Sequence, residues 1–316
     1  IAVMLEKLDI LKDFFHGFDY QAWFGGDTGA KLALLPLAAD FALGEEDGEK
    51  RVKQGASDLS KAFALCASSD AALDVRDEVG FFQAVRSALI KTNPPGQRSD
   101  EDLEAAIRQL IDSAVQPDEV IDIFQKAGVD KPDLSILSDE FLEGLQNMPQ
   151  KNLALETLKK LLDGQIRESR KRNIVEARSF AEMLQQAVLR YQNRSIEAAE
   201  VITQLIALAK KMRASHERGE NMGLSVEEVA FYDALADNHS GKDMGDETLK
   251  LIAQKLAASV RKSVTVDWTL RESARAHMRR TIKRLLREHK YPPDAQAAAV
   301  KLIIEQATLM GGALDG

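Results

Sequence analysis

Seven basic side chains near the C-terminus form the most regular chemical pattern in this sequence. Five recur at steps of four residues and two stand beside that row; the set is Arg271, Arg275, Arg279, Arg280, Lys283, Arg284 and Arg287. Four residues of an α-helix return to nearly the same face, so these side chains form a slowly winding surface, which we call the basic ridge. Such a ridge can neutralise DNA phosphates or pair with the carboxylates of a protein.

The chemistry of the basic ridge leaves three interpretations open. The ridge can contact DNA, dock on an acidic partner that includes the chain's own acidic first half, or form only a solvated face. Residues 261–291 hold ten Lys and Arg against three acids, and the regular spacing suits helix–helix ion pairing as well as DNA contact. A second basic cluster, at Arg167, Arg170, Lys171 and Arg172, ends its own predicted helix, where cations complement the helix dipole.

Motifs for catalysis or for holding a cofactor are not matched. The nearest approach to a phosphate-binding loop, Gly25–Lys31, places its lysine one residue off and lacks the hydroxyl that should follow. We interpret it as a glycine-rich turn in which Asp27 or Thr28 caps a helix. The five histidines include no pair four residues apart, the spacing that puts two imidazoles on one helical face. The sequence predicts no catalytic residue, no metal site and no cofactor in this chain.

The elements that must position the ridge are predicted to be helices throughout. The 316 residues are rich in strong helix formers, the eight prolines are expected at junctions, and no segment holds the alternation of a strand. We expect an all-α, multi-helix bundle of about twelve or more helices without a substantial sheet. Helices are predicted over 2–15, 28–43, 49–70, 75–91, 99–115, 150–171, 175–194, 195–218, 225–237, 246–264, 269–290 and 294–310, with two short ones within 116–150.

Specific residues are predicted to begin and end these helices. Ser138 has the position of an N-terminal cap, and reciprocal capping boxes are expected at Ser225–Glu228 and Thr269–Glu272. Tyr291–Pro293 is predicted to stop the helix that carries the basic ridge.

Charge divides the chain into two predicted helical subdomains. Residues 1–150 hold fourteen Lys and Arg against twenty-eight Asp and Glu, whereas residues 151–316 hold twenty-eight against twenty-two. The second, basic subdomain is therefore expected to face an anionic partner, although both parts can share one core. No apolar run approaches the roughly 20 residues of a membrane span, and the single cysteine, Cys66, rules out an internal disulfide. These features predict a cytoplasmic fragment of a longer protein, without a membrane partner.

Several short strings, in order along nearly the whole chain, resemble one known family. They are residues 15–20 (FHGFDY), 136–142 (ILSDEFL), 151–154 (KNLA), 224–235 (LSVEEVAFYDAL), 266–268 (VDW) followed by the arginines of the ridge, and 291–293 (YPP). The ordered set is similar to the C-terminal helical region of the restriction, or R, subunit of type I restriction–modification enzymes, in the HindI-like group. No single string carries a catalytic mechanism.

The resemblance implies a place in a larger machine. In that family an N-terminal nuclease domain and two RecA-like motor domains precede the helical region, and the parent uses ATP and magnesium to translocate DNA and cut it. The resemblance implies that this region braces the motor and helps the subunit engage the methylation and specificity subunits, with duplex DNA as a further possible partner. It carries no catalytic residue over to this chain. The alternative that we consider is a stand-alone helical nucleic-acid-binding protein.

Overall fold

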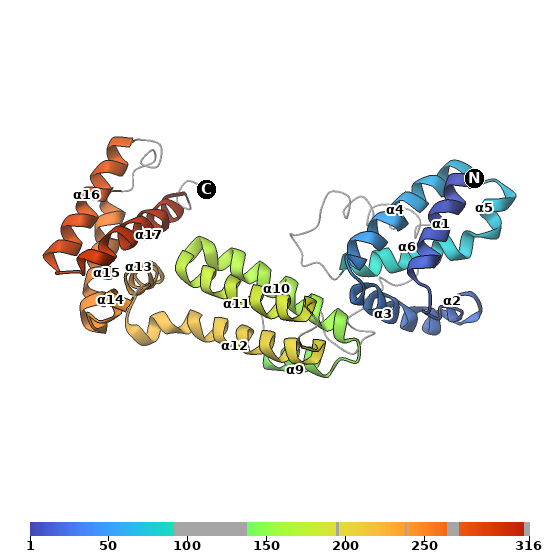
Figure 1. Cartoon of the computed structure of the whole chain (residues 1–316), viewed down its shortest axis with the longest axis horizontal. Helices are drawn as coiled ribbons and strands as arrows, with labels where there is room; N and C mark the ends of the chain where they lie inside the picture. The colour runs from blue at the N-terminus through green and yellow to red at the C-terminus, as the bar shows by residue number, and fades with distance from the viewer. Residues whose placement is uncertain (92–137, 194–195, 238, 264–271, 313–316) are drawn as a thin grey trace. The chain divides into compact units, whose positions relative to one another are not determined.

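The computed structural model describes residues 1–91, 138–193, 196–237, 239–263 and 272–312. Across these ranges the chain forms fifteen helices and no strand, which confirms the predicted all-α class (Figure 1). The helices are α1 (Ala2–Phe14), α2 (Ala22–Gly25), α3 (Thr28–Gly44), α4 (Gly48–Cys66), α5 (Asp70–Asp74), α6 (Arg76–Lys91), α9 (Asp139–Asn147), α10 (Lys151–Arg172), α11 (Ile174–Gln192), α12 (Ala198–Met222), α13 (Val226–Ala236), α14 (His239–Lys242), α15 (Asp246–Ser263), α16 (Glu272–Glu288) and α17 (Pro293–Gly312).

The helices gather into two compact units. The first unit takes residues 1–161 and 190–206, and the second takes residues 162–189 and 207–316. The boundaries fall inside α10, α11 and α12, so each of these long helices contributes a segment to both units. The predicted division into residues 1–150 and 151–316 rests on the charge difference and stays a prediction.

Most predicted helix ends agree with the structure where it describes them. The Ser138 hydroxyl accepts the amide of Phe141 at 3.2 Å, and Ser225 with Glu228 forms the expected reciprocal capping box. The short helices α2, α5 and α14 were not predicted. The helix expected over 99–115 and the Thr269 capping box lie outside the described residues.

One proline contradicts the prediction that prolines occur only at junctions. Pro36 lies inside α3, and its ring is buried together with Leu34, Leu35 and Ala38. A proline inside a helix removes one backbone hydrogen bond and costs on the order of 3 kcal/mol. Because α3 is apolar on several sides and packs against α2, α4 and α6, tertiary burial offsets that cost.

An aromatic cluster lies among the first six helices of the first unit and joins α1, α2, α3 and α6 (blue to cyan in Figure 1). Phe15, at the end of α1, packs its ring against Phe41 of α3 and against Phe81 and Phe82 of α6. Tyr20 stacks on Phe81 with ring centroids 4.6 Å apart. Large rings from α1, α3, α6 and the turn after α1 therefore converge on one point.

Buried polar contacts tie α3 to α10 within the first unit. The Asp40 carboxylate accepts the backbone amide of Leu153 at 2.9 Å and so caps the first turn of α10 from a residue far away in the sequence. Asn152 donates to the Asp40 carbonyl at 3.3 Å, and the Tyr191 hydroxyl donates to the Asn152 side-chain oxygen at 2.8 Å. Burial nevertheless raises the pKa of the Asp40 carboxyl, against the effect of these donors.

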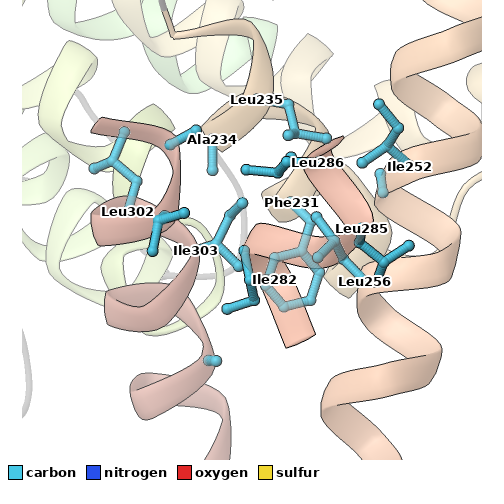
Figure 2. Close-up of a cluster of buried hydrophobic side chains, with 14 of the residues drawn as sticks. Phe231, Ala234, Leu235, Ile252, Leu256, Ile282, Leu285, Leu286, Leu302 and Ile303 are labelled. Atoms are coloured by element: carbon cyan, nitrogen blue, oxygen red, sulfur yellow. The ribbon is translucent and has the colours of Figure 1, made fainter. Parts of the chain in front are cut away.

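An aliphatic core organises α13–α17 in the second unit (orange to red in Figure 1). Figure 2 shows Phe231 and Leu235 of α13 among leucine and isoleucine side chains from α15, α16 and α17. Many of the remaining members are alanines, which let the helices approach closely: Ala234, Ala253, Ala257, Ala295, Ala299 and Ala307. This core includes the buried face of α16, the helix that carries the basic ridge.

Candidate nucleic-acid or partner interface

One face of α16 is anchored in the core of the second unit. Met278, Ile282, Leu285 and Leu286 are all buried, and the last three point into the cluster around Phe231 (Figure 2). These positions occupy about a third of the helix circumference at 100° per residue. The helix therefore cannot rotate about its axis without removing this apolar face from the core. The rotational position of every other α16 side chain follows from that anchor.

The predicted basic ridge is exposed to solvent and winds about 40° around α16 with each four-residue step, from beside the buried face at Arg275 to the opposite side at Arg287. All six described members are exposed: Arg275, Arg279, Arg280, Lys283, Arg284 and Arg287. Arg271 lies outside the described residues. Four of the six recur every fourth residue and so rise about 6 Å per step along the helix axis. The six cations therefore form a strip that winds around about half of the helix circumference.

Little of the ridge charge is neutralised within the described part of the second unit. Arg284 approaches Glu288 at 3.7 Å, a contact between two well-exposed side chains that contributes little energy. Arg287 donates to the Lys283 carbonyl at 3.2 Å, which leaves its charge uncompensated. Among the described residues of this unit, Arg275, Arg279 and Lys283 make no ion pair. The ridge is thus an exposed concentration of positive charge.

The end of α16 differs from its prediction. The helix ends at Glu288, before Tyr291 and the prolines, and Lys290 adopts a left-handed conformation with φ of 54°. The amide of Lys290 donates to Arg287 O at 3.0 Å and that of Tyr291 to Leu286 O at 2.8 Å, the two bonds of a Schellman motif. The prolines follow this stop, and Pro293 begins α17.

Tyr291 fixes this end of the ridge helix in the core. Its ring is 1% exposed, and its hydroxyl donates to the Leu235 carbonyl of α13 at 2.7 Å. A buried carbonyl without a donor would cost free energy, so this bond links the stop of α16 to α13. The sequence showed a Tyr-Pro-Pro break here but not its partner.

A basic side chain of α15 lies beside the C-terminal end of α16. Lys255 Nζ lies 3.0 Å from His289 Nε2, just after the last turn of α16. The sequence reasoning missed this pair because the two residues are 34 positions apart and share no motif. On the same helix, Arg261 is different because it pairs with Glu227 and contacts Ser225 at the start of α13.

The second basic cluster, at the end of α10, is compensated locally. Arg167 pairs with Asp163 at 2.6 Å and Lys171 with Glu168 at 3.0 Å, both within one helical turn. Lys171 lowers the pKa of the Glu168 carboxyl by hydrogen bonding to it. These contacts agree with the prediction that the cluster serves its own helix end.

A buried polar cluster lies near the start of α11 in the second unit. Asn173 donates to the Asp233 carboxylate at 2.6 Å, and Arg218 of α12 pairs with that same carboxylate. Glu176 lies close by, and burial raises the pKa of its carboxyl. The arrangement links α11, α12 and α13 through charge-assisted hydrogen bonds, which is a structural role.

The glycine-rich segment of the first unit forms a turn that leads into a capped helix, as predicted. The Asp27 carboxylate accepts the amide of Ala30 at 2.8 Å and caps α3. Among the described residues, no three His, Cys, Asp or Glu side chains lie together in a group that could hold a metal ion. Among the described helices, none has the length and apolar character that a membrane crossing requires.

Comparisons with known proteins agree on one family. Residues 1–312 match the family described as "Type I restriction enzyme HindI endonuclease subunit-like, C-terminal". The chain is 33% identical over 272 residues to the type I restriction enzyme HindI endonuclease subunit of Haemophilus influenzae, covering 86% of this chain and 26% of that protein. It is 27% identical over 289 residues to the putative type I restriction enzyme MjaIXP endonuclease subunit of Methanocaldococcus jannaschii, covering 90% of this chain and 28% of that protein.

The chain thus spans about a quarter of the length of the curated relatives it matches. No solved structure gives a significant match. Because the family match extends over residues 1–312, and thus over both units and the basic ridge, this chain belongs to the family of HindI-like type I restriction endonuclease subunits, in their C-terminal region.

Proposed function

We propose that this chain is a non-catalytic docking and scaffold region of a type I restriction enzyme R subunit. In this proposal it supports DNA translocation and cleavage by the parent enzyme and promotes its assembly with the methylation and specificity subunits. Nuclease and ATPase chemistry, with ATP and magnesium, belong to parts of the parent outside this chain. The family membership supports the restriction-enzyme context.

The observation that carries the docking role is the anchoring of α16. Four buried side chains hold one face of the helix in an aliphatic core, while six exposed cations wind along its surface. Because the core holds the backbone of α16, binding does not have to order the helix itself, which favours binding. The site is therefore suited to hold an anionic component of the restriction complex.

A stand-alone nucleic-acid-binding protein is the second candidate, because the exposed ridge is equally suited to that role. The match to a family of C-terminal regions favours the first candidate. The two differ in a simple observation: the first requires a helicase-like motor encoded upstream in the same reading frame.

The docking role is tested by charge reversal in the full-length subunit. Arg275→Glu, Arg279→Glu and Lys283→Glu together should weaken formation of the DNA-bound complex with the methylation and specificity subunits. These side chains are exposed, so the helical circular dichroism and thermal midpoint should stay unchanged. Gel-shift titration of the assembled complex measures the effect. Wild-type assembly by a folded variant would refute the docking surface.

A further inference from the structure

We infer that the described part of the basic ridge, from Arg275 to Arg287, binds the phosphate backbone of duplex DNA directly, without reading its sequence. This inference rests on the proposed docking role of α16 and names its partner. Three properties of the described surface lead to it: its composition, its lack of aromatic rings, and its spacing.

The exposed face of α16 offers charge but no apolar anchor. Across the described residues of α15, α16 and α17, Leu251 is the only large hydrophobic side chain that is exposed, and it belongs to α15. Protein–protein interfaces draw most of their energy from buried aromatic, aliphatic and arginine anchors, and their centres are depleted of lysine and of charge in general. A polyanionic backbone needs no such anchor, because counterion release supplies the binding free energy.

The described part of the ridge, on α16, offers no Phe, Tyr or Trp ring on which single-stranded bases could stack. Proteins that bind single-stranded nucleic acid combine a basic groove with aromatic rings on which the bases stack. The sequence of α16 contains no Phe, Tyr or Trp. A duplex keeps its bases stacked inside and presents phosphates outside, which matches a surface made only of cations.

The spacing of the ridge suits contact with several phosphates at once. Arg275, Arg279, Lys283 and Arg287 extend over about 18 Å at 1.5 Å per residue, roughly the rise of five base-pair steps. Arg280 and Arg284 widen this row. The only acidic residues of α16 stand at its two ends, at Glu272 and Glu288.

The salt dependence of DNA binding by the full-length subunit tests this inference. A variant with Arg275→Gln, Arg279→Gln and Lys283→Gln is compared with the wild type on a short non-specific duplex over a series of salt concentrations. Each lost phosphate contact reduces the slope of log K against log salt by roughly 0.9, so the slope should become less steep by about 2 to 3.

A matched control removes the same charge elsewhere in the second unit. Arg170→Gln, Lys171→Gln and Arg172→Gln neutralise three exposed cations at the end of α10 and should change the slope by less than about 1. A second variant, Arg275→Lys with Arg279→Lys, keeps the charge and should keep the slope. The exchange removes the arginine fork, which binds phosphate and carboxylate alike, so the affinity is expected to fall while the slope, which counts charges, stays the same.

The outcomes separate this inference from the docking role. The inference is overturned if the glutamine variant, folded by circular dichroism, shows no larger change of slope than the α10 control. If the variant then also fails to capture the methylation and specificity subunits in a DNA-free pull-down, docking stands and the partner is a protein. If slope, capture and assembly are all unchanged, both proposals fail.

Discussion

The buried side chains of both units are mainly aliphatic, but the first unit adds a cluster of contacting aromatic rings. In the first unit the ring centroid of Phe81 lies 5.9 Å from that of Phe15, 4.6 Å from that of Tyr20 and 5.2 Å from that of Phe82. In the second unit the cluster around Phe231 is otherwise made mainly of leucine, isoleucine and alanine. The aromatic cluster brings several large side chains together at one place in the first unit, whereas the cluster around Phe231 consists mainly of smaller ones. The difference implies unequal sensitivity to single substitutions.

The largest effect is expected at the centre of the aromatic cluster. Phe81 is 0% exposed and contacts Phe15, Tyr20 and Trp23, so Phe81→Ala should cost about 3–5 kcal/mol. Hydrogen exchange in the full-length subunit should accelerate across α1–α6. Phe24→Ala, at a ring that is 39% exposed, serves as the control and should have a small effect. Equal effects of the two changes would refute a concentrated core.

A smaller effect is expected in the aliphatic core. Ile282 is 1% exposed beneath the basic ridge, and Ile282→Ala should cost about 2–5 kcal/mol and less than Phe81→Ala. Hydrogen exchange should accelerate in α15, α16 and α17, because these helices share the core. Leu251→Ala removes an exposed side chain of α15 and is the matched control. If Ile282→Ala destabilised more than Phe81→Ala, the comparison of the cores would be reversed.

The helix caps of the two units offer a finer comparison. Ser225 caps α13 in a reciprocal box, whereas Ser138 caps α9 through its hydroxyl alone. Ser225→Ala should cost about 1–2 kcal/mol and Ser138→Ala about 0.5–1 kcal/mol, because only the first change disrupts a box. Local hydrogen exchange at the first turn of each helix measures both losses. The reverse order would show that tertiary contacts, not the boxes, set these helix starts.

The smallest effect at neutral pH concerns Tyr232 in the second unit. Burial, followed by its 2.7 Å hydrogen bond to Asp246, raises the pKa of the Tyr232 phenol to about 12. A raised folded-state pKa contributes stability that is fully present below the ordinary value of 10.0 and is lost as pH rises toward 12. Between these pH values the free energy of unfolding should fall more steeply for the wild type than for Tyr232→Phe. Parallel alkaline denaturation curves would contradict this assignment.

Local sequence signals predicted the helices well because their causes are local. Ser138 and Ser225 sit one residue before their helices and act on amides three residues ahead, so the pattern contains the cap and its target. The prediction failed at Pro36 and at the very short helix α14, where tertiary packing outweighs weak or unfavourable local preference. The four-residue spacing of the ridge likewise predicted a shared face before any packing was known.

Contacts between residues that lie far apart in the sequence could not be predicted from it. Asp40 caps α10 across 113 positions, Tyr291 bonds Leu235 across 56, and Lys255 meets His289 across 34. None of these pairs belongs to a motif, since each depends on how helices pack and not on their own periodicity. Family membership came from strings spread along the chain, yet those strings say nothing of the contacts between them.

For this protein the sequence alone determined the helical class, the helix caps and the existence of a basic row along α16, because each follows from interactions within one or two helical turns. Only the tertiary structure decided that the row faces solvent. Burial of Met278, Ile282, Leu285 and Leu286 fixes the rotation of α16, and the Schellman turn at Lys290 with buried Tyr291 fixes its end. The basic row is exposed because the core holds the apolar face of α16 and leaves the rest of the helix in contact with solvent.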